Sequence, residues 1–134
     1  MDPPDRALVD RLAAADSVVE VGVGAHPDVA AALADRGVAV TATDVVARSV
    51  PDPVAFVVDD VTDPTPAVYD GADAVFARNC PPELHRPLRA VARLVEADCA
   101  FTTLGGDPPA VPVTRESLPG GETLFRPRDG PGTR

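Results

Sequence analysis

The segment from residue 17 to residue 44 restricts the possible folds more than any other part of the chain. Its first run, SVVEVG, is rich in β-branched residues and predicts a strand over 17–22. A helical pattern follows over 27–36, and Gly37 is placed to end that helix. The run VAVTAT then predicts a second strand over 38–43. Because a strand, a helix and a second strand in this order form a βαβ unit, the segment predicts a parallel sheet.

The remaining sequence continues this alternation of short strands and helical stretches. It predicts helices over 5–15 and from about Pro87 to 97, strands over 55–59, 72–77 and 99–104, and a loop over 59–71. The connection between the second and third strands is too short for a full crossover helix. Two runs that flank Leu118 to Gly121 predict a C-terminal β-hairpin at one edge. The expected fold is α/β, a Rossmann-like three-layer sandwich with a mostly parallel sheet of about five strands. One such domain is expected over 1–128, followed by a loose C-terminal tail over 129–134.

The composition excludes several classes of protein. With 134 residues and 45% hydrophobic content, the chain is long enough for one core and too short for two. No run approaches about 18 consecutive apolar residues, so no membrane span is expected, and the charged, prolyl N-terminus is unlike a signal peptide. Two cysteines, Cys80 and Cys99, indicate a reducing cytoplasm rather than a disulfide framework.

The charged residues are unusual in kind as well as in number. All twelve basic residues are arginine, and the formal net charge is −9. This carboxylate-rich composition looks like that of proteins from salt-loving organisms, and a GC-rich genome would also disfavour lysine codons. Because nucleic-acid binding usually needs a basic surface, binding to nucleic acid without a partner is not expected. The sequence leaves open whether a protein partner or a second copy of the chain is involved.

Two glycines and an acid mark a ligand-binding corner in the βαβ unit. Gly22 and Gly24 follow the first predicted strand, where glycines let a ligand approach the backbone and the helix N-terminus presents unpaired N–H groups. Asp44 ends the second strand, where an acid can accept hydrogen bonds from both ribose hydroxyls. This spacing fits dinucleotide binders and S-adenosylmethionine binders alike.

Two further residues distinguish these ligands. A dinucleotide fingerprint has a third glycine where this chain has Pro27. Glu20 lies two residues before Gly22, where its carboxylate would repel a pyrophosphate. S-adenosylmethionine instead carries a sulfonium and an α-amino group, both positive, so an acid is favourable there. The sequence therefore favours S-adenosylmethionine as the cofactor and a small-molecule adenosyl ligand as the partner, and it disfavours an NAD-dependent oxidoreductase.

The run Val-Glu-Val-Gly-Val-Gly, residues 19–24, resembles the acid-x-Gly-x-Gly motif of class I S-adenosylmethionine-dependent methyltransferases. In that superfamily an acid after the second strand holds the ribose, and an acid after the third accepts from the adenine amino group. The resemblance thus implies cofactor contacts by Glu20, Gly22, Gly24, Asp44 and Asp60. It puts Arg78 and Asn79 at the tip of the fourth strand, on the expected substrate side. The short, acidic chain also looks like an uncharacterised archaeal family of Rossmann-like proteins within this superfamily.

Several other side chains have two interpretations each. His26 stands where the superfamily often has a third glycine, either as a plain loop residue or as a ligand contact or general base. Cys80 follows the fourth strand, where nucleophiles occur, but a semi-buried thiol is the simpler interpretation. Arg78 either binds an anionic substrate or pairs with nearby acids. The two histidines, His26 and His85, lack metal-ligand spacing, so no metal site is expected.

Two functions therefore stay open. One is a small S-adenosylmethionine-binding domain with methyltransferase activity, in which catalysis rests on holding the acceptor in line with the methyl group. The acceptor is not identified, because the run RNCPPEL at 78–84 lacks the aromatic residue of enzymes that methylate nucleic-acid amines. The other is a non-catalytic nucleotide-binding or protein-interaction module, which the short chain and His26 favour. Fold alone cannot choose between them.

Overall fold

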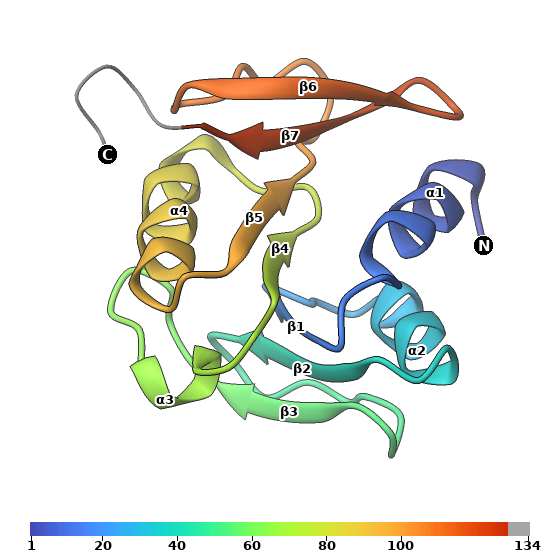
Figure 1. Cartoon of the computed structure of the whole chain (residues 1–134), viewed down its shortest axis with the longest axis vertical. Helices are drawn as coiled ribbons and strands as arrows, with labels where there is room; N and C mark the ends of the chain where they lie inside the picture. The colour runs from blue at the N-terminus through green and yellow to red at the C-terminus, as the bar shows by residue number, and fades with distance from the viewer. Residues whose placement is uncertain (129–134) are drawn as a thin grey trace.

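One β-sheet organises the chain, as Figure 1 shows for the computed structural model, which describes residues 1–128. Its strands are β1 (Ser17–Val21), β2 (Ala39–Asp44), β3 (Ala55–Val58), β4 (Ala74–Ala77), β5 (Asp98–Phe101), β6 (Val113–Leu118) and β7 (Glu122–Pro127). The helices are α1 (Pro3–Leu12), α2 (Asp28–Asp35), α3 (Pro66–Tyr69) and α4 (His85–Leu94), and a 3₁₀ turn, η1, covers Pro82–Leu84. The tail predicted over 129–134 lies outside the described residues.

The strand order is β3-β2-β1-β4-β5-β7-β6. Neighbouring strands from β3 to β5 are parallel, and the order reverses between β1 and β4. The predicted hairpin β6–β7 is confirmed at one edge of the sheet, where β7 pairs antiparallel with β5 at Phe101 opposite Phe125. The sheet therefore has seven strands rather than about five. The prediction was too low because the free edge of β5 offers backbone N–H and C=O groups with which the hairpin pairs.

Helices cover both faces of the sheet, which makes the predicted three-layer α/β sandwich (Figure 1). α1 and α2 lie over one face, on a core of valine, leucine and alanine side chains. α3 and α4 lie over the other face, on a second core that contains Tyr69, Leu88 and Phe101. Side chains alternate along β1, so Val18 belongs to the first core and Val19 to the second. The carboxyl ends of the parallel strands meet at one edge of this sandwich, where such folds bind ligands.

The helices differ from the prediction at three places. α1 begins at Pro3 rather than at residue 5, since prolines suit the first positions of a helix, and Asp5 lies inside its first turn. The predicted loop over 59–71 contains the single turn α3. α4 begins at His85, and Pro87 does not break it because the first-turn N–H groups have no helical partner anyway. None of the helices described is long and apolar enough to cross a membrane.

The end of the sheet formed by β2 and β3 has exposed apolar surface. In the described chain no helix covers the connection between these strands, as its short length predicted. Val45 and Val46, directly after β2, are 62% and 50% exposed, and Val58 at the end of β3 is 56% exposed. Val58 is in register with Asp44, so their side chains lie on the same face of the sheet. The fold itself leaves these valines uncovered beside the predicted ribose acid.

Aromatic rings connect the hairpin to α4. The fully buried His85 stacks on Phe101 with ring centroids 4.1 Å apart, and Phe101 stacks on Phe125 at 5.5 Å. The Ala110 N–H donates to His85 Nδ1 (3.0 Å), so the ring proton is on Nε2, which donates to the Cys80 carbonyl (2.9 Å). This ring column, His85–Phe101–Phe125, holds the loop before β6 against the segment after β4.

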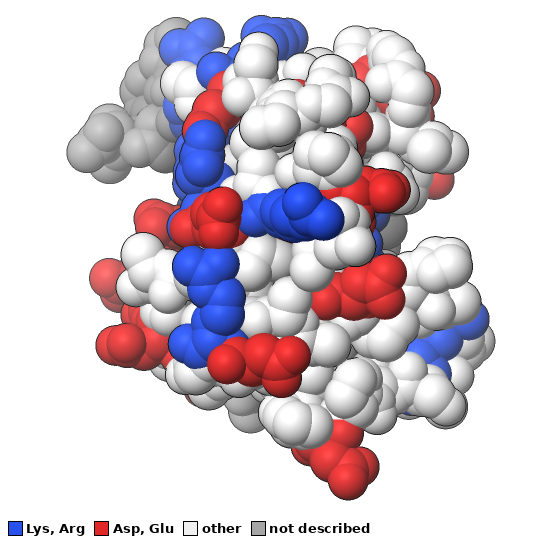
Figure 2. Space-filling model, turned by 90° about the vertical axis from the view of Figure 1, so that its right-hand side faces the viewer, with Lys and Arg blue, Asp and Glu red and all other residues white. Residues whose placement is uncertain are grey.

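Charged residues alternate in sign on the face covered by α1 and α2 (Figure 2). Arg36 pairs with Asp10 at 2.7 Å, and Arg11 pairs with Glu116 of β6. This face therefore has mixed charge and no single continuous basic surface among the described residues.

Candidate functional site

The glycine turn after β1 has the backbone conformation that the sequence predicted. Gly22 and Gly24 have φ values of +71° and +63°, a region that residues with a side chain rarely adopt. The N–H groups of Gly22 and Val23 donate to the Thr43 carbonyl at 2.9 and 3.0 Å, which joins the turn to β2. A Cβ atom at either glycine would meet no other atom within 4 Å. The turn therefore presents open space at the carboxyl end of β1.

Asp44 at the end of β2 is bound directly to this turn. Its Oδ2 accepts the Gly24 N–H at 2.8 Å, and its Oδ1 accepts the Val45 N–H at 2.7 Å. Arg48 adds a longer contact, with its Nε 3.3 Å from Oδ2. These backbone hydrogen bonds orient the Asp44 carboxylate. Because a carboxylate oxygen can accept two hydrogen bonds, Oδ1 can still accept one more.

Glu20 lies on β1, two residues before Gly22, and is completely buried. Its Oε2 accepts from Arg78 Nε at 3.1 Å, while its Oε1 has no hydrogen-bond partner among residues 1–128. Burial raises the pKa of Glu20 to about 7, although the positive charge of Arg78 opposes this shift. A buried oxygen without a partner is costly, and such a group calls for an explanation.

Arg78 bridges three parts of the molecule. From the tip of β4 it contacts Glu20 of β1, donates to the His26 carbonyl, and lies 3.8 Å from Asp5 of α1. The sequence left two interpretations of Arg78 equal, and the structure shows the pairing with acids. His26 itself is exposed and meets this cluster through its backbone.

Two adjacent acids follow β3, and they differ in environment. Asp60 is exposed, and its carboxylate accepts the N–H and the hydroxyl of Thr62 at 2.9 and 2.7 Å, which lowers its pKa. Asp59 is buried and accepts from the Tyr69 hydroxyl at 2.9 Å and from the Thr65 N–H at 3.1 Å. Sequence reasoning missed Asp59, since nothing in the local pattern distinguishes it from Asp60. It anchors the loop that presents Asp60.

Removing the Tyr69 hydroxyl tests this anchor. Tyr69→Phe leaves the buried Asp59 carboxylate with one partner fewer, so we expect the free energy of unfolding to fall by about 1–3 kcal/mol. Urea denaturation in concentrated KCl measures the loss. Asp60→Asn serves as the control and should change stability by less than about 0.5 kcal/mol, because Asp60 is exposed. Equal losses in both variants would contradict the role given to Asp59.

A cavity of about 230 Å³ opens beside Arg78 at the carboxyl ends of β4 and β5. Asn79, with a φ of +51°, donates its backbone N–H to the Thr102 hydroxyl at 3.0 Å. The cavity is lined by Asp2, Pro4, Asp5, Leu8, Arg78, Asn79, Thr102 and Glu122. The predicted substrate-side residues thus line a cavity, together with residues from both ends of the chain that sequence reasoning missed.

Cys80 is not suited to nucleophilic chemistry. It is 3% exposed and packs in the second core, and burial raises the pKa of its thiol to about 12. The thiol is therefore protonated near neutral pH, in keeping with the simpler interpretation of the sequence.

The structure therefore joins the predicted site residues in two pairs, Glu20 with Arg78 and Gly24 with Asp44. Asp60 follows the next strand of the same sheet edge, but among residues 1–128 its carboxylate accepts hydrogen bonds from Thr62 alone.

This arrangement occurs on the Rossmann-like fold of S-adenosylmethionine-dependent methyltransferases. The structure is similar to a TehB-like SAM-dependent methyltransferase from Corynebacterium glutamicum, with a TM-score of 0.61 at 14% identity over 93% of this chain and 86% of that chain. The 1,6-didemethyltoxoflavin-N1-methyltransferase of Burkholderia thailandensis, with bound S-adenosylhomocysteine, gives a TM-score of 0.57 at 19% identity over 92% and 60% of the two chains. A protein described as a Zn-dependent alcohol dehydrogenase from Rhodobacter sphaeroides gives 0.59 at 16% identity over 80% and 48%.

The chain belongs to the family described as "Uncharacterised protein family (UPF0146)", which it matches over residues 3–129. A UPF0146 protein of Halobacterium salinarum is 58% identical over 127 residues, 95% of this chain and 97% of the relative. The UPF0146 protein of Archaeoglobus fulgidus is 48% identical over 90 residues, 67% and 69% of the two chains. The resemblance to a short archaeal family with a halophilic member is confirmed.

Proposed function

We propose that this protein is a small S-adenosylmethionine-binding domain. The observation that carries the proposal is the fully buried Glu20 carboxylate on β1, two residues before Gly22, whose Oε1 has no partner within the described chain. An α-amino group of the ligand would satisfy this oxygen while Arg78 keeps Oε2. A ligand with a pyrophosphate in the same corner would meet the Glu20 carboxylate instead, which disfavours NAD.

Other residues of the corner fit the rest of the cofactor. Asp44 retains acceptor capacity for the ribose hydroxyls, and its orientation is fixed by two backbone N–H groups. The exposed side chains of Val45 and Val58 offer apolar surface to the flat adenine ring. Asp60, exposed after β3, is the acceptor for the adenine amino group. The open space above Gly22 lets the ligand approach the backbone.

Methyl transfer is the reaction to which this site is best suited. S-adenosylmethionine, when bound, supplies a methyl group on a sulfonium, so the chain has only to hold an acceptor in line with it. Asn79 and Thr102 line the neighbouring cavity and can orient an acceptor by hydrogen bonds. No residue is assigned as a general acid or base, because Cys80 is buried with a raised pKa and His26 meets the cluster through its backbone carbonyl.

One observation favours a second candidate, a non-catalytic nucleotide-binding or interaction module. Arg78 already brings a positive charge to Glu20 and also binds the His26 carbonyl. A guanidinium held in this way could take the place of the positive end of a ligand.

Ligand-dependent thermal unfolding of the full chain in concentrated KCl separates these functions. S-adenosylmethionine, S-adenosylhomocysteine, NAD and ATP are each added to the protein. A ligand at 100 times its dissociation constant adds about 2.7 kcal/mol, which raises the midpoint by several degrees. We expect a rise with the two adenosyl-sulfur compounds only. A rise with NAD alone or ATP alone would overturn the proposal, and no rise with any compound would favour the interaction module.

The ribose assignment makes a separate prediction. Asp44→Ala should weaken S-adenosylhomocysteine binding by about 1.5–3 kcal/mol, since the lost hydrogen bonds involve a charged acceptor. Isothermal titration calorimetry measures the change. Asp35→Ala is the matched control, because this substitution removes the same charge from an exposed position at the end of α2. Unchanged affinity in Asp44→Ala would remove the ribose assignment.

A further inference from the structure

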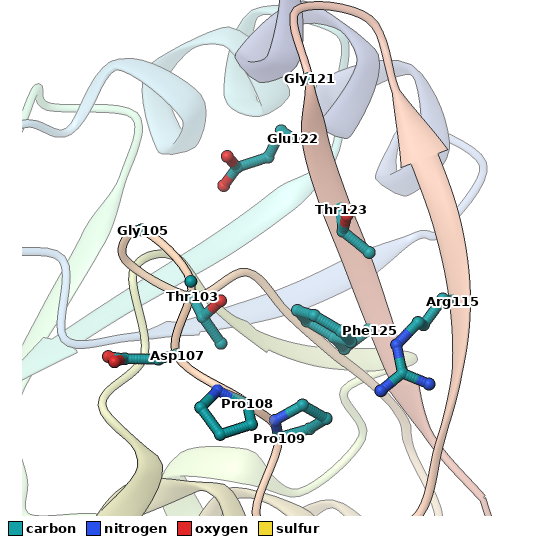
Figure 3. A pocket seen from close by; sticks show the side chains of 11 residues that line it. Thr103, Gly105, Asp107, Pro108, Pro109, Arg115, Gly121, Glu122, Thr123 and Phe125 are labelled. Carbon is teal, nitrogen blue, oxygen red and sulfur yellow. The ribbon is translucent and has the colours of Figure 1, made fainter.

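A second cavity, of about 290 Å³, lies between the β6–β7 hairpin and the loop that follows β5 (Figure 3). None of the residues assigned to the adenosyl ligand lines it. Its walls include Pro108 and Pro109 from the loop and Phe125 from β7, so part of the lining is apolar. A cavity of this volume is suited to a small molecule.

Arg115 of β6 is held at one side of this hairpin cavity. Its guanidinium carbon lies 5.6 Å from the centroid of the Phe125 ring, and Phe101 stacks on the same ring at 5.5 Å. Within residues 1–128 Arg115 forms no ion pair, whereas Arg11, Arg36 and Arg78 all do. A guanidinium in a cation–π contact with a ring still has N–H groups that can bind an anion in a fork.

Acids lie on the opposite side of the hairpin cavity. Figure 3 shows Glu122 and Asp107 on the side away from Arg115, with the Phe125 ring between them and the guanidinium. Glu122 also lines the cavity beside Asn79, so it stands where the two cavities meet. The hairpin cavity is therefore electrically polar, with a positive end at Arg115 and a negative end at Glu122.

We propose that the hairpin cavity binds a small zwitterion, with a carboxylate or phosphate group at Arg115 and a protonated amine at Glu122. The acids would repel a ligand that is only an anion, and Arg115 would repel one that is only a cation. A ligand with both charges meets a partner at each end. This proposal concerns a second ligand and holds whether or not the adenosyl ligand binds at the glycine turn.

Nuclear magnetic resonance titration of the ¹⁵N-labelled full chain tests the proposal. The experiment uses the lowest KCl concentration at which circular dichroism shows a folded protein, because salt screens charges. The probes are γ-aminobutyrate, 6-aminohexanoate and O-phosphoethanolamine, which differ in length and in the anionic group. Butyrate and butylamine are the controls with a single charge. We expect saturable shifts of the Gly105, Gly106 and Thr123 amides with at least one zwitterion, at about tenfold higher affinity than with either control.

Variants separate this cavity from general charge effects. Arg115→Gln and Glu122→Gln should each weaken zwitterion binding about tenfold. Arg6→Gln and Glu96→Gln remove the same charges at exposed positions outside both cavities and should leave binding unchanged. Three results would each overturn the proposal. Butyrate or butylamine could bind as tightly as the zwitterions, Arg115→Gln and Arg6→Gln could bind the zwitterions with equal affinity, or no probe could give saturable shifts. A separate titration with S-adenosylhomocysteine reports on the glycine turn alone. A failure of the proposed adenosyl site is therefore distinguished from a failure of the proposed zwitterion site.

Discussion

Replacing Gly22 with valine is expected to abolish S-adenosylhomocysteine binding. Gly22 has a φ of +71°, and the space beside its Cα is open, so the protein itself does not clash with a side chain there. A valine side chain would project into the space over the turn that the proposed ligand needs. We expect affinity to fall on the order of 100-fold or more, measured by isothermal titration calorimetry.

Gly37→Val is the matched control for this variant. Gly37 ends the α2 segment with a φ of +86°, and a Cβ atom there also meets nothing within 4 Å. Both variants force a β-branched residue into the left-handed region, which costs at least about 1–2 kcal/mol of stability. The two proteins should therefore be destabilised alike, while only Gly22→Val loses the ligand. Equal affinity in the two variants would mean that the ligand binds elsewhere.

The second large effect concerns pH. Burial raises the pKa of Glu20 to about 7 in the folded protein, from an ordinary value of 4.5. Between these two values the folded state holds a proton that the unfolded state has released, so stability falls as the pH rises. The stabilisation is fully present below about pH 4.5 and is lost by about pH 7, with a size on the order of 3 kcal/mol.

Urea denaturation of the wild type and of Glu20→Gln, from pH 5 to pH 8 at constant KCl, isolates this group. Glutamine does not titrate, so the difference in the free energy of unfolding between the two proteins reports on Glu20 alone. We expect the wild type to lose stability relative to the variant as the pH rises. Arg78→Met should move the loss to higher pH, because Arg78 favours the ionised carboxylate. A difference that is independent of pH would contradict the raised pKa.

Much of the parallel sheet could be predicted from the sequence because its signals are local. The β-branched run at 17–22, the glycine turn and the helix that begins after Pro27 all lie in one segment. The hairpin was expected at one edge, but which edge it joins could not be predicted, since this rests on the pairing of Phe101 with Phe125 between distant segments. The single turn α3 was missed because Pro66 reads as a loop signal, although proline also suits the first position of a helix.

In the candidate site, too, some contacts follow from the local sequence and others do not. Glu20, Gly24 and Asp44 belong to the segment that forms the glycine turn, so their proximity follows from the βαβ unit. The pairing of Arg78 with Glu20 depends on β4 lying next to β1, and the sequence alone left it open. The cavity beside Arg78 combines Asp5, Thr102 and Glu122 from three distant segments, and no local pattern connects them.

The residues of the two proposed ligand sites are also separate along the sequence. The residues proposed for the adenosyl ligand fall between positions 20 and 60, whereas the hairpin cavity is built from positions 103 to 125. Substitutions in the C-terminal segment can therefore alter what the hairpin cavity accepts without altering the glycine turn. Such a layout lets the selectivity of the proposed second site change by substitution while the proposed adenosyl site is kept.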